Sequence, residues 1–198
     1  MHISEGVLSV PVIAAGWALA AGGLAAGLKR TRTEKLPETA LVSAALFLAS
    51  LVHVPLGPSS IHLTLLGLAG VLLGWSAVPA LFIALLLQGL LFQFGGLLSL
   101  GVNTTVMGTA ALTGCGVYRA MTPALRPNLR FLSAFTAGFA AVIAGTVLVC
   151  AALFFSDMEL EATAALLFAA NLPLAVVEGV MSAFIVAFLS KTVPRYVS

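Results

Sequence analysis

Residues 10–28 read VPVIAAGWALAAGGLAAGL, an apolar run that ends in the basic segment KRTRTEK of residues 29–35. Similar runs recur along the whole chain, which is 61% hydrophobic and only 8% charged, with a mean hydropathy of +1.13. Soluble domains carry about 25% charged residues. The sequence therefore predicts an all-α, polytopic integral membrane protein with a single transmembrane domain over residues 1–198.

The apolar runs predict about seven transmembrane helices. The third run is short for a full crossing. The last is interrupted at residues 171–173, which leaves open one kinked helix or a short segment followed by a helix. Residues 53–60 hold two prolines and a glycine and are predicted to form a loop. The expected parts are an N-terminal loop (1–9), a helical bundle (10–190) and a tail (191–198), with spans at 10–28, 39–52, 61–73, 77–92, 100–117, 131–155 and 162–189.

The basic residues predict the orientation of the bundle. All Lys and Arg side chains fall within residues 29–35, 119–130 and 191–195. With seven spans these segments share one side, and the positive-inside rule makes that side cytoplasmic. The N-terminus is then outside and the C-terminus cytoplasmic, in a multi-pass protein of the cytoplasmic or inner membrane. The histidines His2, His53 and His62 are all expected on the outer side.

The first two residues form a potential metal chelate. The amine of Met1, the amide nitrogen of His2 and its imidazole would close a five-membered and a six-membered ring. Three nitrogens in one plane suit Ni(II) or Cu(II). Because His2 is large, Met1 is expected to remain after synthesis. On these residues alone, the alternative that the terminus has no metal role stays open.

His62 is a candidate for the fourth nitrogen. It stands at the head of the short third run, whose outer end would be recessed below the membrane surface. An N-terminal loop that enters the bundle would meet it there and complete a planar site of nitrogen ligands, which Ni(II) prefers and Co(II) accepts. The alternative is an interfacial histidine that bonds a loop carbonyl.

Five segments, in order along nearly the whole chain, carry a resemblance. They are Met1-His2-Ile3-Ser4-Glu5-Gly6, Pro58-Ser59-Ser60-Ile61-His62-Leu63, Gln88-Gly89-Leu90-Leu91-Phe92 with Gly95-Gly96, Leu100-Gly101-Val102-Asn103-Thr104 with Met107-Gly108, and Leu172-Pro173-Leu174-Ala175-Val176-Val177-Glu178-Gly179. Together they resemble the CbiM/NikM family, the substrate-capture subunits of nickel and cobalt energy-coupling factor (ECF) transporters, which are ABC transporters. Two departures, at Pro58-Ser59 and at Asn171, weaken any inference about which metal is bound.

The resemblance implies a function and a ligand set. The transported substrate would be Ni(II) as the first choice and Co(II) as the second, and no cofactor is expected. Met1, His2 and His62 match the family's metal ligands, and Asn103 matches a polar position that holds the N-terminal loop. Partners would be a transmembrane coupling subunit, ATPase subunits and often a small accessory membrane protein.

Further polar residues have two interpretations each. Glu178 lies in an apolar run, where a carboxylate is costly unless paired or functional, so it orders the site or packs helices together. Glu5 and Ser60 are expected to support the loop, although Glu5 is as readily a surface residue. His53 is an entry-side donor or a plain interfacial histidine, and Gln88 is an interhelical hydrogen-bonding residue rather than a ligand.

Nucleotide hydrolysis and other enzyme activities are not expected. The chain has no Gly-x-x-x-x-Gly-Lys-[Ser/Thr] motif, so ATP hydrolysis would belong to separate subunits. One alternative is an autonomous secondary transporter or channel lined by Glu178, Asn103 and Gln88. A less favoured one is an intramembrane metalloenzyme, but no His-Glu-x-x-His motif is present. Nothing indicates a nucleic-acid partner.

Overall fold

The computed structural model describes residues 3–51, 53–56, 59–126, 129–156 and 160–193. Within them the chain forms α-helices joined by short turns, with one two-stranded hairpin. Short 3-10 turns precede α2, α4 and the α5–α6 loop. The elements are α1 (Val10–Arg30), α2 (Leu36–Ala49), β1 (His53–Leu56), β2 (Ser59–His62), α3 (Leu66–Leu73), α4 (Ala77–Phe92), α5 (Leu100–Met121), α6 (Arg130–Phe154) and α7 (Leu160–Thr192).

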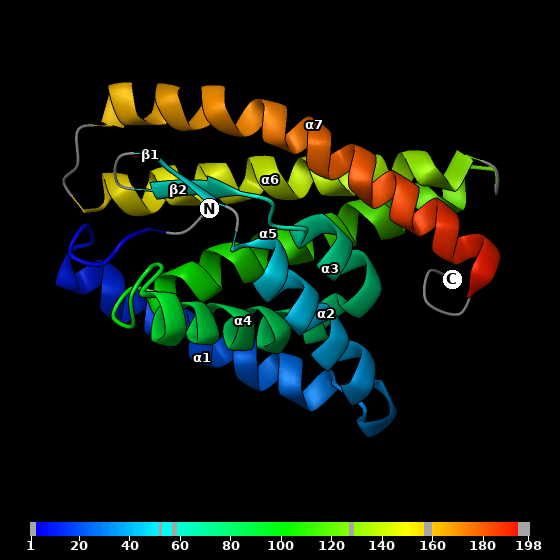
Figure 1. The fold of residues 1–198 in the computed structure, drawn as a ribbon, viewed down its shortest axis with the longest axis horizontal. Helices are drawn as coiled ribbons and strands as arrows, with labels where there is room; N and C mark the ends of the chain where they lie inside the picture. The colour runs from blue at the N-terminus through cyan, green and yellow to red at the C-terminus, as the bar shows by residue number, and fades with distance from the viewer. Residues whose placement is uncertain (1–2, 52, 57–58, 127–128, 157–159, 194–198) are drawn as a thin grey trace.

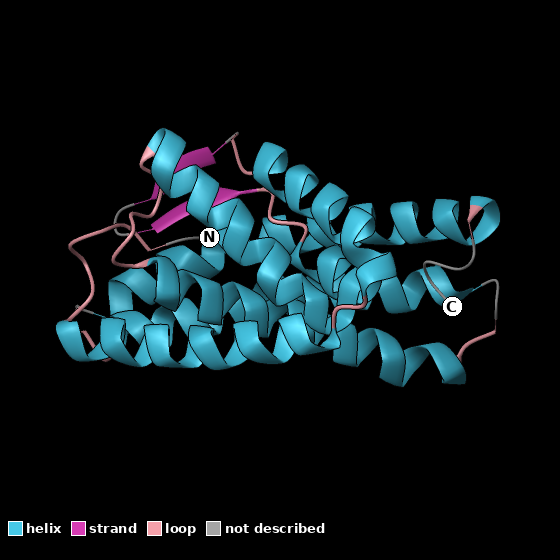
Figure 2. Ribbon diagram, turned by 90° about the horizontal axis from the view of Figure 1, so that it is seen from below, coloured by secondary structure: helices cyan, strands magenta, loops and turns pink. Residues whose placement is uncertain are grey.

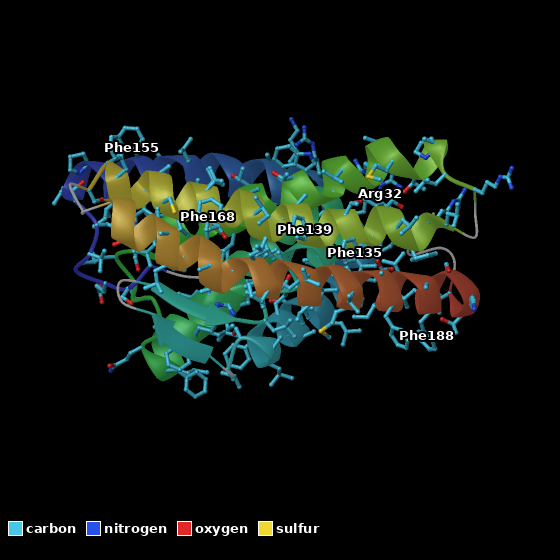
Figure 3. All side chains as sticks on the ribbon, turned by 90° about the horizontal axis from the view of Figure 1, so that it is seen from above. Arg32, Phe135, Phe139, Phe155, Phe168 and Phe188 are labelled. Atoms are coloured by element: carbon cyan, nitrogen blue, oxygen red, sulfur yellow. The ribbon has the colours of Figure 1, made fainter. Side chains whose placement is uncertain are left out.

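The helices have the length and composition of membrane spans. By length and composition alone, four stretches of the described part could cross a bilayer: Val10–Arg30, Leu66–Phe92 (α3, the Gly74–Ser76 turn and α4 taken together), Arg130–Phe154 and Thr163–Thr192. Large apolar side chains face outward, among them Phe155 and Phe168 at one end of the bundle and Phe188 at the other (Figure 3). The predicted helical membrane class is confirmed, whereas seven crossings remain a prediction.

Figure 1 shows how the helices are arranged. The antiparallel helices α6 and α7 lie side by side, and α5 packs against α6, α1 and α4. The hairpin, the α4–α5 loop and the start of α7 lie at one end, and Figure 2 shows both strands there. The end of α1, the α5–α6 connection and the end of α7 lie at the other. The described basic residues therefore gather at one end of the bundle, called the basic end below.

The third predicted span needs a correction. Residues 53–56 and 59–62 pair as two antiparallel strands instead of forming a loop and the first turns of a helix, and their register pairs His53 with His62. Helix α3 begins only at Leu66 and covers about 12 Å, too little for the helix by itself to cross a bilayer. Val54 opposite Ile61 places β-branched residues in the ladder, which favours strand over helix.

The remaining elements lie close to the predicted runs. The last run forms one helix, α7, with Pro173 in its interior, which settles the two possibilities left open above. Helices α3 and α4 are joined by a turn in which Gly74 has φ +56°. That left-handed conformation favours glycine and lets the chain reverse at the basic end.

Glycines bring the helix backbones together in the middle of the bundle. A Cβ on Gly67 of α3 would overlap the Gly138 backbone of α6, and one on Gly70 would overlap the carbonyl of Ala111 in α5. A Cβ on Gly138 would lie 3.0 Å from Gly179 Cα in α7. Small residues permit such close approach in membrane bundles. Helices α3, α5, α6 and α7 therefore pack backbone to backbone.

This packing predicts a contrast between two glycines. Gly70→Ala should lower the thermal midpoint of the detergent-purified protein, because overpacking a tight contact costs about 1–3 kcal/mol. Gly22→Ala on α1 is the matched control, since a Cβ there meets no atom within 4 Å. Equal midpoints for the two variants in a thermal unfolding assay would show that the α3–α5 contact is not tight.

Candidate metal site

Asn103 fixes the backbone next to the predicted chelate. Its Oδ1 accepts a 2.8 Å hydrogen bond from the Ile3 amide, and its Nδ2 donates to the Ile3 carbonyl at 3.0 Å. Ile3 is fully buried, in a cluster with Val149 of α6 and Leu167 of α7. Both polar groups of one peptide residue are thus satisfied inside the bundle. The predicted loop-supporting role of Asn103 agrees with this geometry.

Glu5 ties the same segment to the α4–α5 loop. Its Oε1 accepts a 3.1 Å hydrogen bond from the Leu98 amide, and the Leu98 carbonyl accepts one from Trp17 Nε1 at 3.1 Å. Gly96 has φ +84°, and a Cβ there would lie 2.6 Å from the Glu5 Cβ. Only glycine lets the loop approach this closely. Glu5 is exposed and also bonds the α4–α5 loop, so this geometry is compatible with either of its two interpretations.

Glu178 is fully buried and holds the segment that follows β2. Its Oε1 accepts hydrogen bonds from the amide of Thr64, from the Thr64 hydroxyl at 2.6 Å and from the amide of Leu65 at 2.8 Å. Helix α3 starts at the next residue, and a carboxylate is favourable at the positive end of a helix. Its Oε2 has no hydrogen-bond partner among the described residues. Glu178 therefore joins two helices and orders the chain two residues beyond His62.

His62 lies at the inner end of β2 and is only 3% exposed. Its Nδ1 is 3.1 Å from the Leu63 carbonyl oxygen. A carbonyl only accepts, so Nδ1 carries the hydrogen, and in a neutral ring Nε2 then holds the lone pair. Metal-bound histidines commonly use one nitrogen for a carbonyl and the other for the metal. The carbonyl contact and a ligand role are therefore compatible.

The structure gives less information on the other predicted site residues. Gln88 is buried in α4, and its Oε1 has no hydrogen-bond partner among the described residues. Met1 and His2, and the side chains of His53 and Ser60, lie outside the described residues. In the described part no group of three or more His, Cys, Asp or Glu side chains is placed to hold a metal.

Several contributors were not singled out from the sequence. Thr64 gives both its amide and its hydroxyl to Glu178, and Ser99 Oγ lies 3.4 Å from Asn103 Nδ2 and bonds the carbonyl of Gly95. A threonine just before a short helix is a weak signal for a capping interaction. Nothing in the sequence indicates that its partner lies on α7.

Comparison with known proteins gives this arrangement a family. A model of the family described as CbiM, cobalt uptake substrate-specific transmembrane region, matches residues 2–196. The chain belongs to the CbiM family. The resemblance noted from the five sequence segments is thereby confirmed, and the family is one of transport proteins, not of enzymes.

Individual CbiM-family relatives cover nearly all of the chain. A putative metal transport protein of Haemophilus influenzae is 39% identical over 98% of this chain and 96% of its own length. The cobalt transport protein CbiM of Sorangium cellulosum is 36% identical over 96% and 91%. The crystal structure of a truncated transition metal transporter superposes with a TM-score of 0.86 at 27% identity, covering 97% of this chain and 99% of that one. The helical bundle is thus that of a CbiM-type membrane transport component for cobalt or nickel.

The Asn103 contacts predict a local change on mutation. In Asn103→Ala the Ile3 amide should exchange with solvent roughly 10- to 100-fold faster, because each buried group left without a partner costs about 1–3 kcal/mol. Hydrogen exchange with mass spectrometry of the N-terminal peptide measures it. Asn171→Ala is the matched control, since Asn171 is an equally buried amide on α7. Unchanged exchange in Asn103→Ala would remove Asn103 as the support of this loop.

Proposed function

We propose that this chain is the metal-capturing subunit of an ECF-type ABC transporter in the cytoplasmic or inner membrane. Its substrate is Ni(II) first and Co(II) second. The observation that carries this proposal is the burial of Ile3 between α5, α6 and α7, held by Asn103. Because Ile3 directly follows His2, its clamp in the bundle restricts where the proposed ligands of residues 1 and 2 can lie.

The proposed ligands are four nitrogens. Met1 supplies its amine, His2 its amide and imidazole, and His62 its imidazole. Two residues span at most about 7 Å, so the clamp on Ile3 limits how far the amine can move. A planar set of four nitrogens favours Ni(II), which is the basis for placing nickel before cobalt. Relatives named for nickel and for cobalt transport are consistent with both substrates.

The supports of the two ligand-bearing segments come from different helices. Asn103 of α5 holds Ile3, one residue from His2, and Glu178 of α7 holds Thr64, two residues from His62. Outer-shell partners of this kind set ligand orientation and change metal affinity by roughly 10- to 100-fold. Glu5, and in our proposal Ser60 and His53, complete the surroundings of the entrance.

Release to the cytoplasm is assigned to partner subunits. The backbones of α3, α6 and α7 approach closely at Gly67, Gly138 and Gly179, which argues against a metal path between these helices at that level. We infer that ATPase subunits and a coupling protein reorient this subunit as a whole, and that seven segments traverse the membrane with the basic end cytoplasmic.

The terminal chelate predicts sensitivity to residues added at the N-terminus. Placing two glycines before Met1 moves the free amine out of the chelate ring and puts the histidine at position 4, too far along to form a new terminal four-nitrogen chelate, so Ni(II) affinity should fall by more than about 100-fold, beyond what outer-shell changes cause. Isothermal titration of the purified protein with Ni(II) and Co(II) measures it, with His2→Ala as a second variant. Two glycines added after Ser198 are the control. Full affinity in the N-terminally extended protein would refute the chelate.

The same chelate predicts a pH dependence. Binding deprotonates the His2 amide, so protons are released and compete with the metal. Affinity should therefore fall as pH falls, by about tenfold per pH unit for each proton released. Titrations at several pH values in two buffers of different ionisation enthalpy give the proton count. Affinity independent of pH, with no proton released, would exclude a deprotonated amide ligand.

A further inference from the structure

A second feature of the molecule lies on its lipid-facing side, away from the hairpin. A groove of about 430 Å³ lies beside the α1–α5 contact and is lined by α1, α5, Val78 of α4 and Trp75 of the α3–α4 turn. Its walls are small or apolar, and they include Ala18, Gly22 and Ala26 of α1 and Thr105, Thr109 and Leu112 of α5. A Cβ on Gly22 would meet no atom within 4 Å, so the groove is open at its middle.

Two arginines lie just beyond the groove, at the Gly74–Trp75 turn. Arg30 lies on the same face of α1 as Ala18, Gly22 and Ala26, four residues after Ala26. Its guanidinium carbon is 4.2 Å from the centre of the Trp75 ring. Arg119 continues the face of α5, seven residues after Leu112. Its Nη2 lies 3.2 Å from where a Cβ on Gly74 would be. Both guanidinium groups are therefore beside the Gly74–Trp75 turn.

The groove is nearly as long as one membrane leaflet is thick. Its lining on α1 runs from Ala18 to Ala26, a rise of about 12 Å, and Arg30 follows about 6 Å further along the helix. Half of a bilayer's hydrocarbon core is about 15 Å thick. Tryptophan at the mouth of the groove is typical of the interface between hydrocarbon and headgroups. An apolar groove of nearly one-leaflet length is thus followed by two cations at headgroup depth.

We propose that this groove binds an anionic phospholipid. One acyl chain lies between α1 and α5, and the phosphate is held by Arg30 and Arg119 beside Trp75. Charge complementarity selects this occupant, because a helix of another protein would bring an apolar surface to the groove but no fixed anion to the two arginines. A zwitterionic lipid would fill the groove and bind less tightly, since its headgroup carries a compensating cation.

Lipid titration of the purified full chain tests the headgroup contact. Native mass spectrometry should show one tightly retained phosphatidylglycerol and weaker retention of phosphatidylcholine. Arg30→Gln and Arg119→Gln should each weaken phosphatidylglycerol binding by about fivefold, the effect of one cation near an anionic surface. Lys191→Gln removes one charge at the same end on α7 and should change nothing. An equal loss in Lys191→Gln would overturn the site in favour of diffuse charge attraction.

A groove-filling variant tests the acyl-chain contact. Gly22→Leu projects into the open groove and should abolish the retained lipid while both arginines remain. Ala21→Leu is the matched control, because Ala21 is exposed on another face of α1 and does not line the groove. Unchanged phosphatidylglycerol binding in Gly22→Leu would overturn the proposal. Circular dichroism of each variant shows whether the fold is retained.

Discussion

Backbone that leaves the helical state inside a bilayer must find its hydrogen-bond partners within the protein. Two segments of this chain do so, and one side chain from a neighbouring helix serves each. Asn103 bonds both polar groups of Ile3, and Oε1 of Glu178 accepts the amides of Thr64 and Leu65. Without these partners neither the N-terminal segment nor the turn into α3 could remain buried, because an unsatisfied group in an apolar interior costs several kcal/mol.

The short length of α3 follows from the same constraint. A helix that began at Ile61, as the apolar run predicted, would satisfy its own backbone and would need no carboxylate on α7. The chain instead forms a hairpin to His62, turns at Leu65 with φ +51°, and begins α3 beneath the Glu178 carboxylate. The half-length helix places His62 inside the bundle rather than at its surface, and a histidine there is 3% exposed.

The sequence predicts the helices better than their supports. Long apolar runs locate α1, α4, α5, α6 and α7 to within a few residues, because burial of backbone in lipid permits little else. Asn103 and Glu178 stand out as polar residues in apolar surroundings, so their importance is visible. The sequence does not identify their hydrogen-bond partners. Ile3 is 100 residues from Asn103, Thr64 is 114 residues from Glu178, and neither isoleucine nor threonine is a residue type that indicates a tertiary contact.

Separate supports on α5 and α7 also restrict how the molecule can move. If Met1, His2 and His62 share one metal, sliding of α7 against α5 would carry Thr64 away from Ile3 and break the coordination plane. The glycine contacts that join α3 to α6 and α6 to α7 oppose such sliding, because closely packed backbones leave no free space for one helix to shift along another. Rotation of the whole bundle keeps every one of these contacts. The packing therefore favours a subunit that is reoriented as a rigid body over one that opens an internal path.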